Sequence, residues 1–120
     1  MSDFDQVLRG LAGRIPGARM LIIMDTDGIP VARWNARSDP LLEAVAAEYT
    51  TLLRASLAAA SDTGLGGLRE VTVVTEKMTA LMTAITPEYF LFAALAPEAG
   101  LGRARYALRV TGLSLENEFA

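Results

Sequence analysis

Residues 21–34, LIIMDTDGIPVARW, decide the fold because they hold two apolar runs joined by a short polar turn. A run of Met, Leu and Ile follows Arg19 and ends at Met24, and apolar residues recur over 29–34 beyond the turn. Asp-Gly between two such runs is a strong signal for a β-hairpin, because glycine accepts the positive φ that a tight turn requires. The sequence therefore predicts two antiparallel strands here.

A helix is predicted on each side of this hairpin. Over Asp3–Arg14 apolar residues recur at helical spacing, and Pro16-Gly17 is the stop signal. After the hairpin, Ser38-Asp39-Pro40 starts a second helix that we expect to run from Pro40 to about Ala60. At about 100° per residue its large apolar residues share one side: Leu41, Leu42, Val45, Tyr49, Leu52, Leu53 and Leu57.

The second half of the chain reads as three strands and a helix. A glycine-rich loop over 61–67 leads into extended segments at Leu68–Thr75, Thr79–Ile85 and Tyr89–Ala96. A helix over Gly100 to about Leu115 carries one apolar face: Leu101, Ala104, Leu108 and Leu115. This order predicts an α+β fold, a five-stranded antiparallel sheet with helices on both faces. No linker or repeat divides it, so residues 1–120 are expected to form a single domain.

The composition of the chain excludes several classes of function. The 120 residues contain no cysteine and no histidine, which removes disulfides, thiolate and imidazole nucleophiles, the usual general base, and nearly all zinc chemistry. A net charge of -3 and a pI near 4.9 argue against nucleic acid and anionic membranes as partners. The start, Ser2 to Asp5, is no signal peptide, and the apolar runs are too short to span a bilayer. We therefore expect a cytoplasmic protein without catalytic site, metal or cofactor, whose partners are proteins.

Three local motifs have a functional and a structural interpretation. Asp25-Thr26-Asp27-Gly28 begins like a calcium loop, but the glutamate expected at the twelfth position is missing, so a hairpin turn is favoured. Gly64-Leu65-Gly66-Gly67 follows a helix and precedes a strand, which is typical of a helix C-cap and not of a phosphate cradle. The arginines of the last helix favour a solvated face over an anion site: Arg103, Arg105 and Arg109.

The middle helix is unusual in what it lacks. Only Glu43, Glu48 and Arg54 are charged between Pro40 and Ala60. The side away from its apolar stripe carries small residues, which let another helix approach closely: Ala44, Ala47, Thr51, Ala55 and Ala58. The valines at 71, 73 and 74 make the following strand suitable for pairing with a second chain if it lies at a sheet edge. Both features favour protein contacts.

The sequence resembles the roadblock, or dynein light chain, family, and specifically its bacterial MglB-like branch. The resemblance covers Phe4 to Leu115 and rests on three pieces: the hairpin at 21–34, the strands at 75–96 and GLGRARYALR at 100–109. It implies a roadblock-like (profilin/longin-like) fold and a homodimer in which the third strands pair edge to edge. It also implies binding of a small Ras-like GTPase, whose hydrolysis such proteins promote by arranging the GTPase's own residues.

These considerations predict two sets of contact residues. The partner-binding surface is expected around Glu43, Ala47, Thr50, Thr51 and Arg54. The dimer interface is expected to contain Ala44, Ala55, Ala58, Arg69, Val71, Val73 and Thr75. One alternative is a structural scaffold subunit of a motility or signalling complex that does not respond to a nucleotide switch. Another is a small-molecule sensor with a pocket between sheet and helix.

Overall fold

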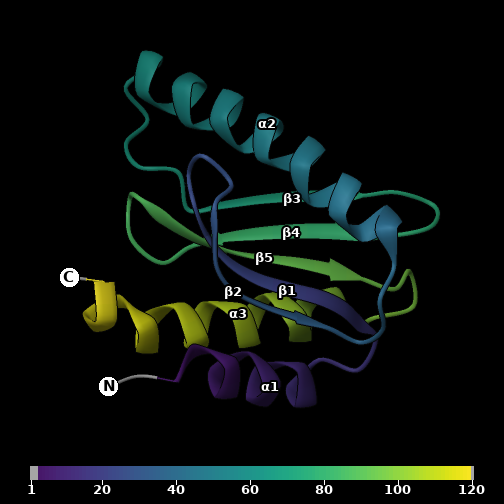
Figure 1. Cartoon of the computed structure of the whole chain (residues 1–120). Coiled ribbons are helices and arrows are strands. Elements are labelled where there is room, and N and C mark those ends of the chain that lie inside the picture. Colours follow the sequence, from purple (N-terminus) through teal and green to yellow (C-terminus); the bar gives the residue numbers. More distant parts are fainter. Residues whose placement is uncertain (1–2, 120) are drawn as a thin grey trace.

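The computed structural model describes residues 3–119, which form a five-stranded sheet with helices on both faces (Figure 1). Helices α1 (Phe4–Arg14) and α3 (Leu101–Leu115) lie along one face, and α2 (Pro40–Asp62) crosses the other. A short 3-10 helix, Glu116–Phe119, follows α3. The predicted α+β class, the element order and the five-stranded antiparallel sheet with helices on both faces are confirmed.

The sheet is antiparallel throughout, with the strand order β2-β1-β5-β4-β3. The strands are β1 (Ala18–Asp25), β2 (Pro30–Asn35), β3 (Glu70–Val74), β4 (Thr79–Ala84) and β5 (Tyr89–Leu95). The three inner strands, β1, β5 and β4, are buried along almost their whole length. Helices cover them on both faces, which explains why they read as continuous apolar runs instead of alternating ones. The strands β2 and β3 form the two edges.

Alternate residues of the inner strands supply two separate cores. Leu21 and Ile23 point toward α1 and α3, where they pack in one cluster with Leu108. Ile22, between them, points to the opposite face and packs in the other cluster with Leu53 of α2. Each helix layer is thus held by its own apolar cluster, as the strand period of two requires.

The β1–β2 turn confirms the hairpin prediction. The Asp25 carboxylate accepts hydrogen bonds from the backbone N–H groups of Asp27 and Ile29, each at 2.9 Å. Gly28 has a φ of 84°, which disfavours any residue with a side chain. A Cβ at this position would lie 2.8 Å from Cγ2 of Thr50, so the turn also packs tightly against α2.

The glycine-rich segment after α2 confirms the predicted helix C-cap. Leu65 N–H donates to the Ala60 carbonyl at 3.0 Å, and Gly64 N–H donates to the Ser61 carbonyl at 3.1 Å. Gly64 has a φ of 68°. These are the two bonds and the left-handed residue of a Schellman motif. The helix ends at Asp62, slightly later than expected.

The predicted apolar stripe of α2 needs a correction. Leu41 and Leu52 are 61% and 38% exposed, so they do not face the sheet. The buried line of the helix runs through Leu42, Ala46 and Leu53. The predicted stripe was too wide because it included only large apolar residues. The small Ala46 lies at the centre of the buried side. Two leucines therefore belong to the surface.

Candidate interaction surface

The outer face of α2 has two sides with different neighbours. Glu43 forms an ion pair with Arg33 of β2. The Arg54 guanidinium donates to the Asp27 carbonyl in the β1–β2 turn at 3.4 Å. These contacts place Glu43 and Arg54 above the hairpin. We call Glu43, Ala47 and Arg54 the hairpin side of α2.

The other side of α2 borders the β3 edge of the sheet. At about 100° per residue, Leu41, Leu52 and Ala55 lie across the helix from Glu43, and the strand order puts β3 opposite β2. The two leucines and Ala55 are exposed, and so is Glu48, which the same spacing places between them. We call these three residues the edge side of α2. Exposed leucines beside an open strand mark a surface that another chain can cover.

The free edge of β3 is available for pairing. The N–H of Ala84 donates to the Arg69 carbonyl at 2.9 Å, and the N–H of Thr75 donates to the Met78 carbonyl at 3.0 Å. Backbone groups in an antiparallel ladder alternate in direction. The N–H and C=O groups of the alternate residues Glu70, Thr72 and Val74 therefore point away from β4. They form a row of unpaired donors and acceptors.

Most of the residues predicted as contacts lie on this surface. The small residues of α2 chosen from the sequence are all exposed: Ala44, Ala47, Thr51, Ala55 and Ala58. The side chains of Val71 and Val73 are half-buried against the cluster beneath α2, and Arg69 and Thr75 are exposed. The structure thus brings the two predicted sets together along α2 and β3.

Thr50 does not fit its predicted role as a partner contact. It is only 5% exposed, and its hydroxyl donates to the Ala46 carbonyl at 2.8 Å. The residue lies where α2 meets the β1–β2 turn, under Gly28. On α2, Thr50 lies at the margin of the buried side. The β1–β2 turn packs over this margin and covers the side chain.

Sequence reasoning missed several residues of the surface. Leu41 and Leu52 were assigned to the core, and the outward backbone groups of Glu70, Thr72 and Val74 were not distinguished from their neighbours. Nothing within β3 itself reveals which residues face outward, because that depends on the register with β4. The 68% exposure of Val74 follows from its place on the open edge.

Arg105 corrects the prediction of a solvated arginine face on α3. Its Nε donates to both carboxylate oxygens of Glu70, at 3.0 and 2.9 Å. The Thr72 hydroxyl donates to the same carboxylate at 2.9 Å. Arg105 therefore ties α3 to β3. Arg103 and Arg109 are exposed, as expected.

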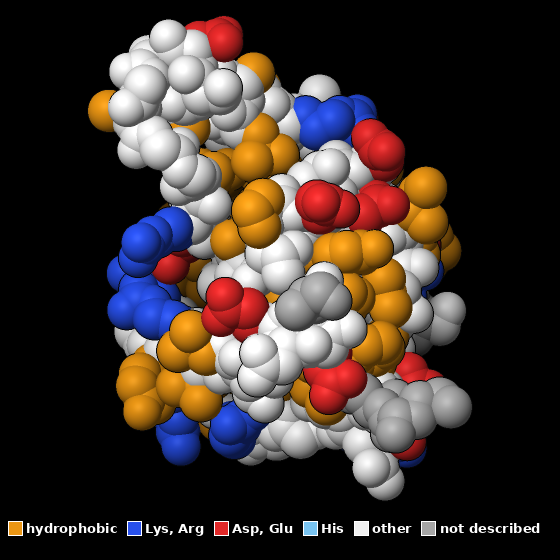
Figure 2. Space-filling view, turned by 90° about the vertical axis from the view of Figure 1, so that its left-hand side faces the viewer, with side chains coloured by type: hydrophobic (Ala, Val, Ile, Leu, Met, Phe, Trp, Pro, Cys, Tyr) orange, Lys and Arg blue, Asp and Glu red, His pale blue; other side chains and the backbone are white. Residues whose placement is uncertain are grey.

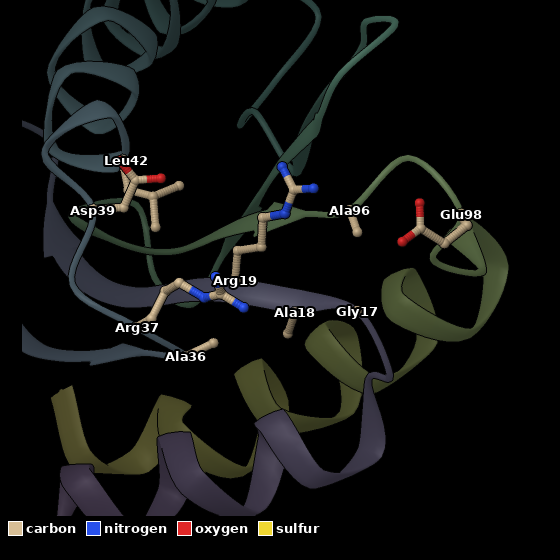
Figure 3. A pocket seen from close by; sticks show the side chains of 9 residues that line it. All are labelled: Gly17, Ala18, Arg19, Ala36, Arg37, Asp39, Leu42, Ala96 and Glu98. Carbon is tan, nitrogen blue, oxygen red and sulfur yellow. The ribbon is translucent and has the colours of Figure 1, made fainter.

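A pocket of about 480 Å³ lies at the end of the sheet near the start of α2 (Figure 3). The side chains of Arg19 and Arg37 reach into it, and Glu98 and Asp39 also line it. Arg19 donates to the Lys77 carbonyl at 3.2 Å, and Asp39 accepts the Leu41 N–H at 2.9 Å as the cap of α2. Two arginines and two carboxylates balance, so the pocket has no net charge to select an ionic ligand.

Two further properties concern metals and membranes. Across residues 3–119, no three carboxylates are grouped in a way that could hold a metal ion. Within the same part of the chain, every helix is too short or too polar to cross a bilayer.

Fold and surface together define a small α+β module with one open sheet edge beside an almost uncharged helix face. Residues 4–96 match the model of the Roadblock/LC7 domain, and the chain belongs to this family. Members of this family are in general non-catalytic adaptor domains.

Solved structures agree with this assignment. A Roadblock/LC7 domain from Streptomyces avermitilis superposes with a TM-score of 0.84 at 21% identity, covering 98% of each chain. MglC from Myxococcus xanthus is 34% identical over 96% of this chain and 98% of its own, with a TM-score of 0.68. The gliding protein MglB from Thermus thermophilus gives 0.82 at 21% identity, covering 96% and 88%. No curated protein matches the sequence.

Proposed function

We propose that this chain is a cytoplasmic homodimeric adaptor that binds a small Ras-like GTPase and regulates it by remodelling the partner. One observation carries the proposal. The valine-rich edge strand β3 lies open next to the exposed Leu41 and Leu52 of a helix with few charges, in a chain of the Roadblock/LC7 family. Exposed apolar side chains beside unpaired backbone groups are stabilised when a second chain covers both.

The dimer would form by two-fold pairing of β3 with its copy. Thr72 is the middle residue of Glu70–Val74, so antiparallel pairing about Thr72 joins the outward backbone groups of both strands into one continuous sheet. The edge sides of the two α2 helices then come together and cover Leu41 and Leu52. The small side chains of Ala44 and Ala55 allow the close approach that this arrangement requires, whereas Ala58 lies nearer the hairpin side.

The GTPase would bind the surface that the two α2 helices leave exposed. The hairpin sides, Glu43, Ala47 and Arg54, together with Thr51, stay on the outside of such a dimer. A broad platform with few charges suits a switch region whose shape depends on the γ-phosphate, so we expect preference for the GTP-bound form. The Arg54 guanidinium is engaged by the Asp27 carbonyl, which favours regulation by rearranging the partner over donation of an arginine finger.

Known structures support assembly as part of the function. MglB, at 20% identity and a TM-score of 0.81, has been solved in a tetrameric arrangement. MglC shares 34% of its residues with this chain. This likeness supports an adaptor role for the present chain.

Two measurements test the proposal. Light scattering at micromolar concentration should give the mass of a dimer; a monomer mass would overturn the assembly. The second measurement is a pull-down with the small GTPase whose gene lies nearest to the gene for this chain. The GTPase is loaded with GDP or with a non-hydrolysable GTP analogue, and the GTP-like form should be captured preferentially. Equal or absent capture of both forms would favour the scaffold function instead.

A further inference from the structure

A second surface lies on the face of the sheet opposite α2. A groove of about 640 Å³ runs between α3 and the strands β3 and β4. Arg69, Arg109 and Leu113 are among the residues that line it. Its size is within the range of sites that hold a ligand or a short peptide segment. The GTPase proposal makes no use of this region.

Beside the groove, α3 comes close to β4. Gly112 lines it without a side chain, and a Cβ there would already lie 3.4 Å from the Ala84 carbonyl oxygen. Thr83, also in the lining, is 8% exposed and its hydroxyl has no hydrogen-bond partner among the described residues. Buried hydroxyls are normally paired. The lining of the groove thus contains a buried hydroxyl without a hydrogen-bond partner in the described part of the chain.

The surroundings of the groove carry a small excess of positive charge, because Arg105, next to the lining, pairs with one of its two glutamates. Between Leu101 and Leu115, α3 has three arginines and no acidic residue, whereas the chain has a net charge of -3. Arg69 and Arg109 form no ion pair within residues 3–119. Glu70 is neutralised by Arg105, so Glu116 is the one carboxylate of the lining without an ion-pair partner in the described part of the chain. The charge that remains is positive.

Apolar side chains continue from the groove onto the outer side of α3. Tyr106, Val110 and Leu113 are 70%, 37% and 65% exposed. Their spacing places them in one stripe along the helix, beside Arg109. The end of the molecule that carries the C-terminus of α3 also shows basic side chains next to hydrophobic ones, at the left of the space-filling view (Figure 2). Apolar and cationic groups are thus combined on one surface.

We propose that this groove binds an acidic segment of a partner protein. Carboxylates of the segment would pair with Arg69 and Arg109, whose guanidinium groups are suited to bidentate carboxylate binding. An apolar side chain between those carboxylates would pack against Leu113. Because α2 and α3 lie on opposite faces of the sheet, the two surfaces can be occupied together. The module then links a GTPase on one face to an acidic protein on the other.

Site-specific photo-crosslinking in the cells that produce this protein tests the inference. A photoreactive residue replaces Leu113, and a matched one replaces Gln6, which is exposed on α1 away from the groove. Leu113 should give an adduct whose partner peptide, identified by mass spectrometry, has at least two Asp or Glu residues flanking an apolar one. The position on α1 should not give this adduct.

Charge reversal supplies the second readout. Arg109→Glu should lower the adduct yield about tenfold or more, since it replaces attraction by repulsion at a rim contact. Arg103→Glu, on the same helix but outside the lining, should change the yield less than about twofold. Arg109→Ala replaces Arg109→Glu if the latter fails to fold, and an intermediate loss of yield is then expected.

Four outcomes overturn the proposal: no adduct at Leu113, an adduct between two copies of this chain, a partner segment without acidic residues, or a yield unaffected by Arg109→Glu and Arg109→Ala. Capture of the GTPase by Arg109→Glu should equal that of the unchanged protein. If neither the unchanged protein nor Arg109→Glu captures the GTPase, that result would count against the GTPase proposal alone.

Discussion

The two edge strands of the sheet are built in opposite ways. The strand β2 begins with Pro30, which has no N–H to offer, and its Arg33 is engaged by Glu43 of α2. Trp34 packs in the cluster beneath α1. These are the means by which proteins keep an edge strand from pairing with other chains. We call β2 the closed edge, because these features disfavour its pairing with another chain.

The strand β3 has none of these protections along Glu70–Val74. It contains no proline and no lysine, and three of its five residues are valine. Its one ion pair, Glu70 with Arg105, lies on the α3 face and leaves the backbone groups of the edge free. The difference between the two edges supports the proposal that β3 pairs with a second chain.

The largest effect is expected from a charge on the edge side of α2. Ala55→Glu would bury two carboxylates per dimer, at a cost of at least about 3 kcal/mol, or roughly a hundredfold in the dimer dissociation constant. Ala47→Glu, on the hairpin side, should leave the dimer intact and weaken GTPase capture. Sedimentation and pull-down measure the two effects. If neither variant changes either measurement, the face is merely exposed.

A somewhat smaller effect is expected at the closed edge. Gly28→Ala combines a φ of 84° with a Cβ 2.8 Å from Thr50, which should lower the free energy of unfolding by about 3 kcal/mol. Gly64→Ala is the control, because its φ is 68° but no atom lies within 4 Å. It should cost only about 1 kcal/mol. Urea denaturation measures both, and equal losses would show that the contact with Thr50 contributes nothing.

Local signals in the sequence were enough to predict most of the fold. Asp-Gly in the hairpin and the proline at the start of α2 act through backbone preferences of single residues, so they can be read without tertiary structure. The continuous apolar strands and the valines of β3 could also be identified from the sequence. The uncharged side of α2 was also predicted, and it is exposed.

The finer assignments depend on contacts between distant segments. Thr50 is buried because the turn at Gly28 packs over it, and Leu41 is exposed because α2 rests on a narrower side than its leucines suggest. The outward residues of β3 are fixed by their register with β4. The groove beside α3 depends on how the helix packs on β3 and β4, which no single residue signals in the sequence. Each case requires knowledge of which segments meet.

The last prediction compares the two edges directly. Thr72→Pro removes an N–H that points away from β4, so the ladder within the chain survives, while the proposed dimer loses two hydrogen bonds across its seam. Each such bond contributes about 1 kcal/mol, so the dimer should weaken by about 2 kcal/mol, or roughly thirtyfold. Thr72→Val keeps the N–H and loses only the hydroxyl that bonds to Glu70. It should leave the dimer almost unchanged.

Asn35→Pro is the matched change on the closed edge. Ala36 N–H donates to the Arg19 carbonyl at 2.9 Å, so the neighbouring N–H of Asn35 points outward, as that of Thr72 does. An edge strand tolerates proline at such a position. Analytical ultracentrifugation of the three variants should therefore show dissociation for Thr72→Pro alone, with circular dichroism confirming that each remains folded. If Asn35→Pro dissociates the dimer and Thr72→Pro does not, the chains pair through β2, and the difference between the edges has been interpreted the wrong way round.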